Sequence, residues 1–157
     1  MKQLSVNKIF GGQQGQYKHY SETLKCDMQF SVFLPQSNDE NGESIEKMPA
    51  IYWLSGLTCN DQNFVTKAGA QRAASKFGVA IICPDTSPRG EGVPDDRDGA
   101  WDFGLGAGFY VNATQSPWAE HYQMYDYIVT ELPKVIAANF PIDTTNVSVS
   151  GLSLIHI

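Results

Sequence analysis

The first third of the chain alternates apolar and polar residues with a period of two, a pattern typical of half-buried strands. We predict short strands over Leu4–Phe10, Tyr17–Leu24 and Met28–Leu34, with a glycine-containing turn at Gly11–Gly15. These strands are interpreted as an antiparallel meander. The polar stretch 36–44 has nothing to bury and is predicted to be a solvent-exposed loop.

After Met48 the pattern changes to continuous apolar runs of strand length that alternate with helical segments. The strands are predicted at Ala50–Leu54, Val79–Cys83 and Val147–Ser150. The helices are predicted at Asn63–Phe77 with a break near Gly69 and a stop at Gly78, at 118–127, and at 127–139 with a bend or restart at Pro133. This alternation indicates a parallel sheet with helices on both faces.

Two further segments of the second half are irregular. Pro141–Asp143 is predicted to be a turn before the last strand. The segment Asp85–Pro117 is rich in Gly, Pro and Asp but also contains Trp101 and other aromatic residues. Long segments without regular structure are usually functional in a compact domain. We therefore predict that Asp85–Pro117 and the loop Ser55–Cys59 form the walls of a pocket.

The length and charge of the chain exclude several classes of protein. The 157 residues fit one domain, and a net charge of −6 argues against a nucleic-acid partner, which would require clustered Lys and Arg. No apolar run approaches the ~20 residues of a membrane helix, and no secretion signal is recognisable at the N-terminus. A cytoplasmic location is expected, and the odd, widely spaced Cys26, Cys59 and Cys83 are predicted to be reduced thiols.

The triplet Gly151-Leu152-Ser153 follows a buried-type strand directly. This is where an α/β-hydrolase carries its nucleophile in the motif G-x-S-x-G, on a sharp strand-to-helix turn. The motif is incomplete, because Ile155 occupies the position of the second glycine. The triplet alone is more typical of an ordinary serine at the end of a strand.

The loop Ser55–Cys59 follows the strand Ala50–Leu54. A glycine-containing loop at this place can direct a backbone N–H at a developing oxyanion, although glycine after a strand more often only makes the turn. Cys59 could be read as a nucleophile. We favour a small buried or pocket-lining thiol, since no basic residue lies near it in the sequence to activate it.

Cofactor motifs are not apparent. The three histidines lack metal-ligand spacing, and Gly104–Gly108 lacks the spacing of a dinucleotide-binding loop. We predict neither a metal site nor a dinucleotide site.

Together these segments resemble the S-formylglutathione hydrolases, the esterase D group of the α/β-hydrolases. The resemblance covers nearly the whole chain, and its longest blocks are Ile51–Cys59, Lys67–Arg72, Pro84–Gly90, Trp101–Gly104 and Gly106–Tyr110. It implies the N-terminal part of an α/β-hydrolase fold, in which antiparallel strands lead into a mainly parallel sheet flanked by helices. Residues 1–157 would then be a single domain, incomplete at its C-terminus.

The resemblance also implies a function and a set of site residues. The family hydrolyses S-formylglutathione to glutathione and formate by serine acyl-enzyme chemistry, without a metal or organic cofactor, and the full-length parent is expected to form a homodimer. Ser153 falls at the nucleophile position, and the backbone N–H groups of Leu57 and Leu154 fall at the oxyanion donors. Gly56, Cys59 and Trp101 are the residues expected to contact substrate.

The chain departs from the family after Gly151. The family continues as Gly-His-Ser-Met-Gly-Gly-His and later supplies the catalytic Asp and His, whereas this chain reads 152–157 as Leu-Ser-Leu-Ile-His-Ile. We expect that 152–157 is not family sequence and that the chain alone is inactive. The alternatives are a related carboxylesterase or acyltransferase of the same fold, or a non-catalytic chain that pairs its exposed edge with a partner.

Overall fold

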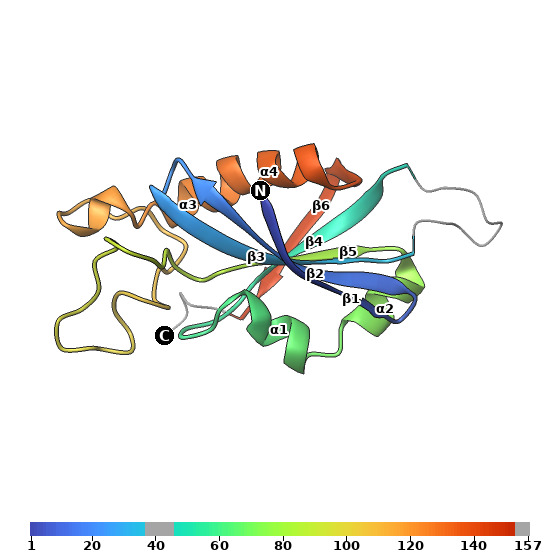
Figure 1. Ribbon diagram of the computed structural model, residues 1–157, viewed down its shortest axis with the longest axis horizontal. Coiled ribbons are helices and arrows are strands. Elements are labelled where there is room, and N and C mark those ends of the chain that lie inside the picture. The colour runs from blue at the N-terminus through green and yellow to red at the C-terminus, as the bar shows by residue number, and fades with distance from the viewer. Residues whose placement is uncertain (37–45, 153–157) are drawn as a thin grey trace.

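A six-stranded mixed sheet forms the centre of the computed structural model, which describes residues 1–36 and 46–152 (Figure 1). The strands are β1 (Lys2–Ile9), β2 (Gly12–Ser21), β3 (Cys26–Leu34), β4 (Met48–Leu54), β5 (Ala80–Pro84) and β6 (Ile142–Gly151). Their order across the sheet is β1-β2-β3-β5-β4-β6. The first three strands and β5 pair antiparallel, while β4 pairs parallel with both β5 and β6. The predicted meander leading into a parallel sheet is confirmed.

The start of β2 differs from the sequence prediction. Gly12 and Gly15 lie within β2 and not in a turn, so the turn is confined to Phe10 and Gly11. Both glycines are required by packing: a Cβ on Gly12 would collide with the carbonyl oxygen of Leu34, and one on Gly15 would collide with the ring of Tyr17. A glycine in a strand can therefore mark close approach and not a turn.

The end of β2 also comes earlier than predicted. The strand ends at Ser21 and not at Leu24, because the Ser21 hydroxyl accepts the Leu24 N–H at 3.0 Å and closes a turn. Lys25 completes this turn with φ +51. Of the loop predicted at 36–44, only Gln36 lies within the described residues.

The first helical region forms two short helices, α1 (Asp61–Lys67) and α2 (Gln71–Phe77). The Asn60 side chain caps α1 by accepting the Gln62 N–H at 3.0 Å. Gly69, at φ +64, lies in the break between the helices, and Gly78 ends α2 in the left-handed conformation. Both the predicted break and the predicted stop are confirmed.

The second helical region is less regular than predicted. It consists of a 3₁₀ turn η1 (Trp118–Glu120), α3 (Met124–Asp126), a π-helical turn η2 (Tyr127–Glu131) and α4 (Leu132–Asn139). The helix predicted over 118–127 is interrupted, because the Tyr122 carbonyl accepts the Ala113 N–H and the Met124 N–H donates to the Val111 carbonyl. Pro133 stands in the first turn of α4, where its missing N–H is tolerated, so the predicted restart is confirmed.

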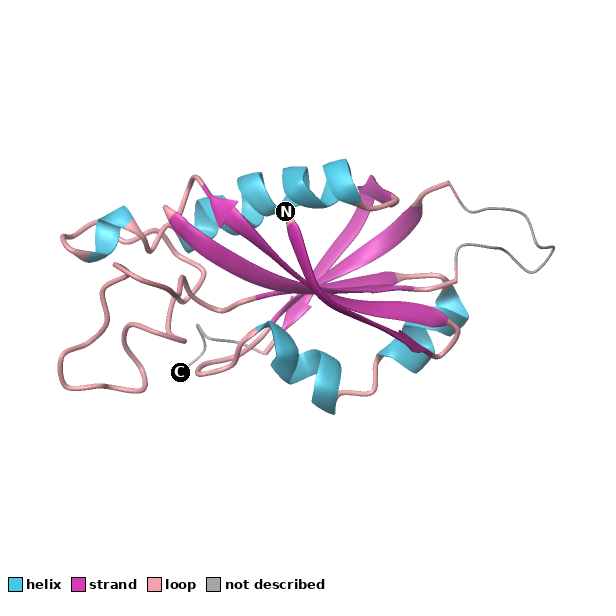
Figure 2. Ribbon diagram, viewed as in Figure 1, coloured by secondary structure: helices cyan, strands magenta, loops and turns pink. Residues whose placement is uncertain are grey.

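Helices cover both faces of the sheet. Figure 2 shows α4 on one face and α1 with α2 on the other. Beneath α4 lies the larger core, which includes Phe30, Tyr127, Leu132 and Ile136. A smaller cluster beneath α1 and α2 contains Phe33, Ala74, Ile81 and Cys83. In the described part of the chain, no helix is long and apolar enough to cross a membrane.

The strand β6 lies at one edge of the sheet. It pairs with β4 on one side, and within residues 1–36 and 46–152 no strand pairs with its other side. Val147 and Val149 are 43% and 66% exposed, and every residue from Thr144 to Gly151 is exposed, so the prediction of a buried-type strand here is wrong. The strand begins at Ile142 and not after a turn at Pro141–Asp143, because Met48 pairs with Ile142 and donates its N–H to the Pro141 carbonyl.

Candidate functional site

The loop Ser55–Cys59 lies beside the end of β6. Leu54 is in register with Gly151, and the Leu152 N–H donates to the Leu54 carbonyl at 3.1 Å. A Cβ on Gly56 would lie 3.5 Å from the Leu152 Cβ. Because β4 and β6 are parallel neighbours, their carboxyl ends bring the predicted oxyanion loop next to the residue that precedes Ser153.

Hydrogen bonds hold this loop at both ends and in its middle. The Ser55 carbonyl accepts the Tyr110 hydroxyl at 2.9 Å, and the Thr58 N–H donates to the Gly106 carbonyl at 3.0 Å. Within the loop the Cys59 N–H donates to the Gly56 carbonyl at 3.2 Å. The Leu57 N–H donates to no acceptor among residues 1–36 and 46–152. The same holds for the Gly56 N–H among the described residues, so this fixed loop leaves more than one backbone N–H free to donate, as an oxyanion site requires.

The loop backbone is strained at Thr58. Its φ of +65 is a left-handed conformation that a β-branched residue rarely adopts. Such strain costs on the order of 1–3 kcal/mol and persists only where the surroundings fix the backbone. The hydrogen bonds from Tyr110 and to Gly106 supply that support on either side of Leu57.

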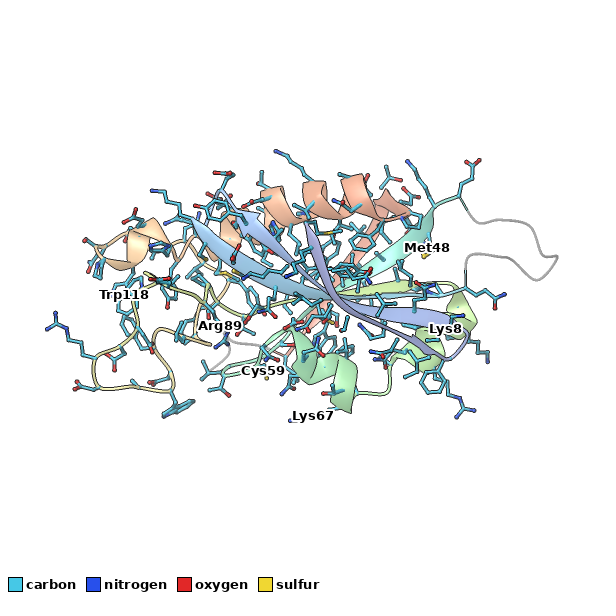
Figure 3. The ribbon with its side chains drawn as sticks, viewed as in Figure 1. Lys8, Met48, Cys59, Lys67, Arg89 and Trp118 are labelled. Atoms are coloured by element: carbon cyan, nitrogen blue, oxygen red, sulfur yellow. The ribbon has the colours of Figure 1, made fainter. Side chains whose placement is uncertain are left out.

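The carbonyl of Cys59 is held by the segment that follows β5. It accepts the Thr86 hydroxyl at 2.5 Å and an Arg89 guanidinium N–H at 3.1 Å. Arg89 also donates to both carboxylate oxygens of Asp85 at 3.0 Å. Cys59 and Arg89 are labelled in Figure 3. Burial raises the pKa of Asp85, and the Arg89 charge opposes that rise.

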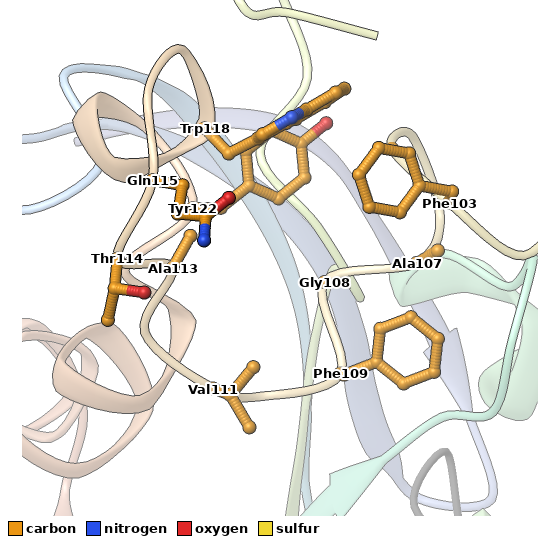
Figure 4. Close-up of a pocket in the computed structure, with 11 residues that line it drawn as sticks. Phe103, Ala107, Gly108, Phe109, Val111, Ala113, Thr114, Gln115, Trp118 and Tyr122 are labelled. Atoms are coloured by element: carbon orange, nitrogen blue, oxygen red, sulfur yellow. The ribbon is translucent and has the colours of Figure 1, made fainter. Parts of the chain in front are cut away.

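A pocket of about 310 Å³ opens beside the loop (Figure 4). Four aromatic residues contribute to its wall, namely Phe103, Phe109, Trp118 and Tyr122. Phe103 and Tyr122 pack edge-on against Trp118, with ring centroids 4.6 and 5.2 Å away. Most of the lining residues come from the segment predicted to form pocket walls. Ala107 and Gly108 of the wall directly follow Gly106, which accepts the Thr58 N–H. The same stretch of backbone therefore lines the pocket and holds the loop.

The structure brings some of the predicted site residues together and leaves others apart. Gly56, Leu57 and Cys59 lie in one loop and are partly buried. Trp101 is 67% exposed and does not line the aromatic pocket, so its role in binding substrate stays a prediction. Ser153 and Leu154 lie outside the described residues, and their roles also stay predictions.

The cysteine side chains differ in their surroundings. Cys26 and Cys83 are buried, whereas Cys59 is partly exposed. Burial raises the pKa of Cys26 to about 11 and the pKa of Cys83 further still. All three thiols are unpaired in the structure, and their reduced state stays a prediction. Within the described residues, no group of His, Cys, Asp and Glu side chains could hold a metal ion.

Sequence reasoning missed the residues that position the loop. Thr86, Arg89 and Tyr110 stand in an irregular segment, and no local pattern connects them with a loop about 30 to 50 positions earlier. One signal was present: Gly106 and Gly108 are glycines in an aromatic-rich segment, which indicates close backbone approach.

Comparisons with known proteins agree with this geometry. The Esterase family matches residues 21–154. The chain belongs to this esterase family. It is 51% identical over 154 residues to the S-formylglutathione hydrolase of Rattus norvegicus and 52% identical over 155 residues to that of Arabidopsis thaliana, which confirms the resemblance inferred from the sequence.

Coverage of these relatives is partial. Each match covers 98% of this chain but 52% of the relative, so the chain spans about half the length of the curated relatives it matches. The solved structure of an S-formylglutathione hydrolase from Agrobacterium tumefaciens superimposes with a TM-score of 0.91 at 45% identity, over 98% of this chain and 53% of that one. The α/β-hydrolase fold predicted for this half is confirmed.

Proposed function

We propose that this chain carries the oxyanion loop and part of the substrate pocket of a serine hydrolase that cleaves S-formylglutathione to glutathione and formate. The Leu57 N–H carries this proposal, because it lies in the loop beside the end of β6 and has no acceptor in the part of the chain that the structure describes. Support comes from the 51% identity to an S-formylglutathione hydrolase and from the membership of the esterase family.

The proposed chemistry proceeds through an acyl-enzyme. The Ser153 hydroxyl adds to the formyl carbonyl, and a general base takes its proton. The carbonyl oxygen becomes an oxyanion, to which the Leu57 N–H donates. The C–S bond then breaks, glutathione leaves with a proton, and water releases formate from the formyl ester. A serine hydroxyl requires a positioned base at neutral pH, and the triad order Ser, Asp, His places that base after Ser153 in the chain.

The domain proposal follows from the same reasoning. We expect residues 1–157 to be one incomplete α/β-hydrolase domain, and 152–157 not to be family sequence, although the match to the Esterase family extends to residue 154. The His and Asp of the triad would then be absent, and the isolated chain would have little or no activity. The predicted homodimer of the longer protein and the cytoplasmic location stay predictions.

A thioester-cleavage assay on the purified 157-residue chain tests this proposal. We expect no turnover of S-formylglutathione above the uncatalysed rate, and no change in Ser153→Ala. Turnover that Ser153→Ala abolishes would show that the chain is complete enough for catalysis. A longer form of the protein that continues past Gly151 with family sequence should cleave the thioester, and its Ser153→Ala variant should not.

A related carboxylesterase or acyltransferase is the second candidate. The aromatic wall formed by Phe103, Phe109, Trp118 and Tyr122 favours it, because such a wall suits an aryl or bulky acyl group. Comparing S-formylglutathione with simple aryl esters on the longer form separates the two candidates. A preference for the aryl ester in kcat/KM would support the second.

A non-catalytic chain that pairs its β6 edge with a second copy is the third candidate. Support comes from the exposed Val147 and Val149 and from an adjoining apolar groove lined by Trp53, Phe64 and Phe77. An open, apolar strand edge is a template for pairing with another chain. Size-exclusion chromatography tests this candidate, since a stable monomer of 17.3 kDa would contradict it.

A further inference from the structure

Side chains from outside the candidate oxyanion loop bond its two ends. The Tyr110 hydroxyl bonds the carbonyl at the start of the loop, on Ser55, and the Thr86 hydroxyl bonds the carbonyl at its end, on Cys59. Both donors are buried: Tyr110 is 8% exposed and Thr86 is fully buried. The loop is therefore held from the segment after β5 as well as by its own hydrogen bond from Cys59 to Gly56.

The two carbonyl groups that these donors bond lie on either side of Leu57 in the loop. The Thr58 N–H is in turn committed to the Gly106 carbonyl, and the Gly106 N–H is held by the Ser87 hydroxyl at 2.8 Å. A free loop would relax the left-handed Thr58, because nothing local favours φ +65 at a threonine. Relaxation would rotate the peptide between Leu57 and Thr58, and with it the neighbouring Leu57 N–H.

Tyr110 also has an unusual backbone. Phe109 and Tyr110 have φ of +50 and +51, two successive left-handed residues that are not glycine. This geometry lets neighbouring side chains serve two sites: Phe109 lines the aromatic pocket, and Tyr110 reaches the Ser55 carbonyl. Of these two adjacent residues, one thus lines the pocket and the other holds the loop.

We propose that Tyr110 and Thr86 are positioning residues, whose hydroxyl groups hold the loop in the conformation that presents the Leu57 N–H. The role of that N–H rests on the proposed function above. The positioning itself is a property of the folded chain and is measurable without turnover.

Amide hydrogen exchange of the ¹⁵N-labelled 157-residue chain tests this proposal. Thr86→Val replaces the hydroxyl with a methyl group of similar size, and Tyr110→Phe removes only the phenolic oxygen. In each variant we expect exchange of the Thr58 amide to accelerate about five- to tenfold relative to the core amides of β3, since one buried hydrogen bond is lost. Thr86→Ser keeps the hydroxyl and should restore slow exchange.

Tyr127→Phe is the matched control. It also removes a buried tyrosine hydroxyl, one that lies 2.9 Å from His19 Nε2 and makes no hydrogen bond to the loop among the described residues. The Thr58 amide should exchange in this variant as in the parent chain, relative to the same core amides. Equal acceleration in Tyr127→Phe, or none in Thr86→Val, would overturn the proposal.

The outcome is independent of the thioester assay. If the loop responds as expected while a longer active form shows no cleavage of S-formylglutathione, the positioning stands and the proposed substrate fails. If that longer form cleaves the thioester and the Thr86→Val exchange is unchanged, the proposed function stands and the positioning fails. In that longer form, Thr86→Val should lower kcat while leaving KM within about twofold, as expected for a group that acts on the transition state.

Discussion

The Thr58 N–H donates to the Gly106 carbonyl at 3.0 Å, and a Cβ on Gly106 would lie 3.1 Å from the Thr58 Cα. Two residues with positive φ, the strained Thr58 at +65 and Gly106 at +81, thus meet at this hydrogen bond. Neither can withdraw without breaking the contact between the candidate oxyanion loop and the pocket wall. Gly106 is therefore required twice, for its φ and for the space beside it.

Gly106→Ala should lower the free energy of unfolding by about 1–3 kcal/mol, because the new Cβ both strains the backbone and presses on Thr58. Gly92→Ala is the matched control: its φ is +85, and a Cβ there meets nothing within 4 Å. Urea denaturation measures both variants. The extra loss in Gly106→Ala reports the contact, and equal losses would show that the contact contributes nothing.

Ile136→Ala in α4 should destabilise the chain by about 2–5 kcal/mol. The Ile136 side chain is fully buried within the larger core, and its removal leaves a cavity. Val129→Ala, at a residue that is 50% exposed, should change the stability by less than about 0.5 kcal/mol. The midpoints of urea unfolding distinguish the two. Similar effects from both would mean that α4 does not pack as described.

The stability of the chain should fall as the pH drops below about 6.5, the ordinary pKa of histidine. Burial lowers the pKa of His19, although the nearby Glu131 charge opposes this. The unfolded chain then binds the proton at a higher pH than the folded chain. The stability that the neutral side chain contributes is complete above 6.5 and is lost as the pH falls towards the lowered pKa.

Unfolding in urea at several pH values between 5 and 8 checks this expectation. In His19→Gln the fall in the free energy of unfolding just below pH 6.5 should disappear. A slope that is the same in both proteins would assign the pH dependence to other groups.

Cys59 should react with iodoacetamide before Cys26 and Cys83, since it alone of the three is partly exposed. Burial raises the pKa values of the other two thiols, which keeps the reactive thiolate scarce. Peptide mass spectrometry of the folded chain over time gives the order. All three should react at similar rates once the chain is unfolded in urea, and early labelling of Cys83 in the folded chain would contradict the described core.

The strands and helix signals of the middle of the chain were predictable because they are local. The apolar runs 50–54 and 79–83 became β4 and β5, and Gly69 and Gly78 mark the break and the end of the first helical region. The candidate loop was predictable for the same reason, since it directly follows a recognisable strand. The family resemblance was carried by blocks of residues in order, which a sequence displays without any structure.

The remaining features depend on segments that meet only in space. Ile142 joins β6 because Met48 pairs with it, and residues 122–124 leave the helical path because Tyr122 and Met124 bond to Ala113 and Val111. The same holds for the site, where Tyr110 and Thr86 reach carbonyl groups in a loop far away along the chain. Hydrophobic periodicity and turn residues therefore determined the strands and helices and their order along the chain. The tertiary structure decided which polar groups meet at the loop. The physical reason is that hydrogen-bond partners of irregular backbone are chosen by the folded geometry, and a local pattern contains no record of them.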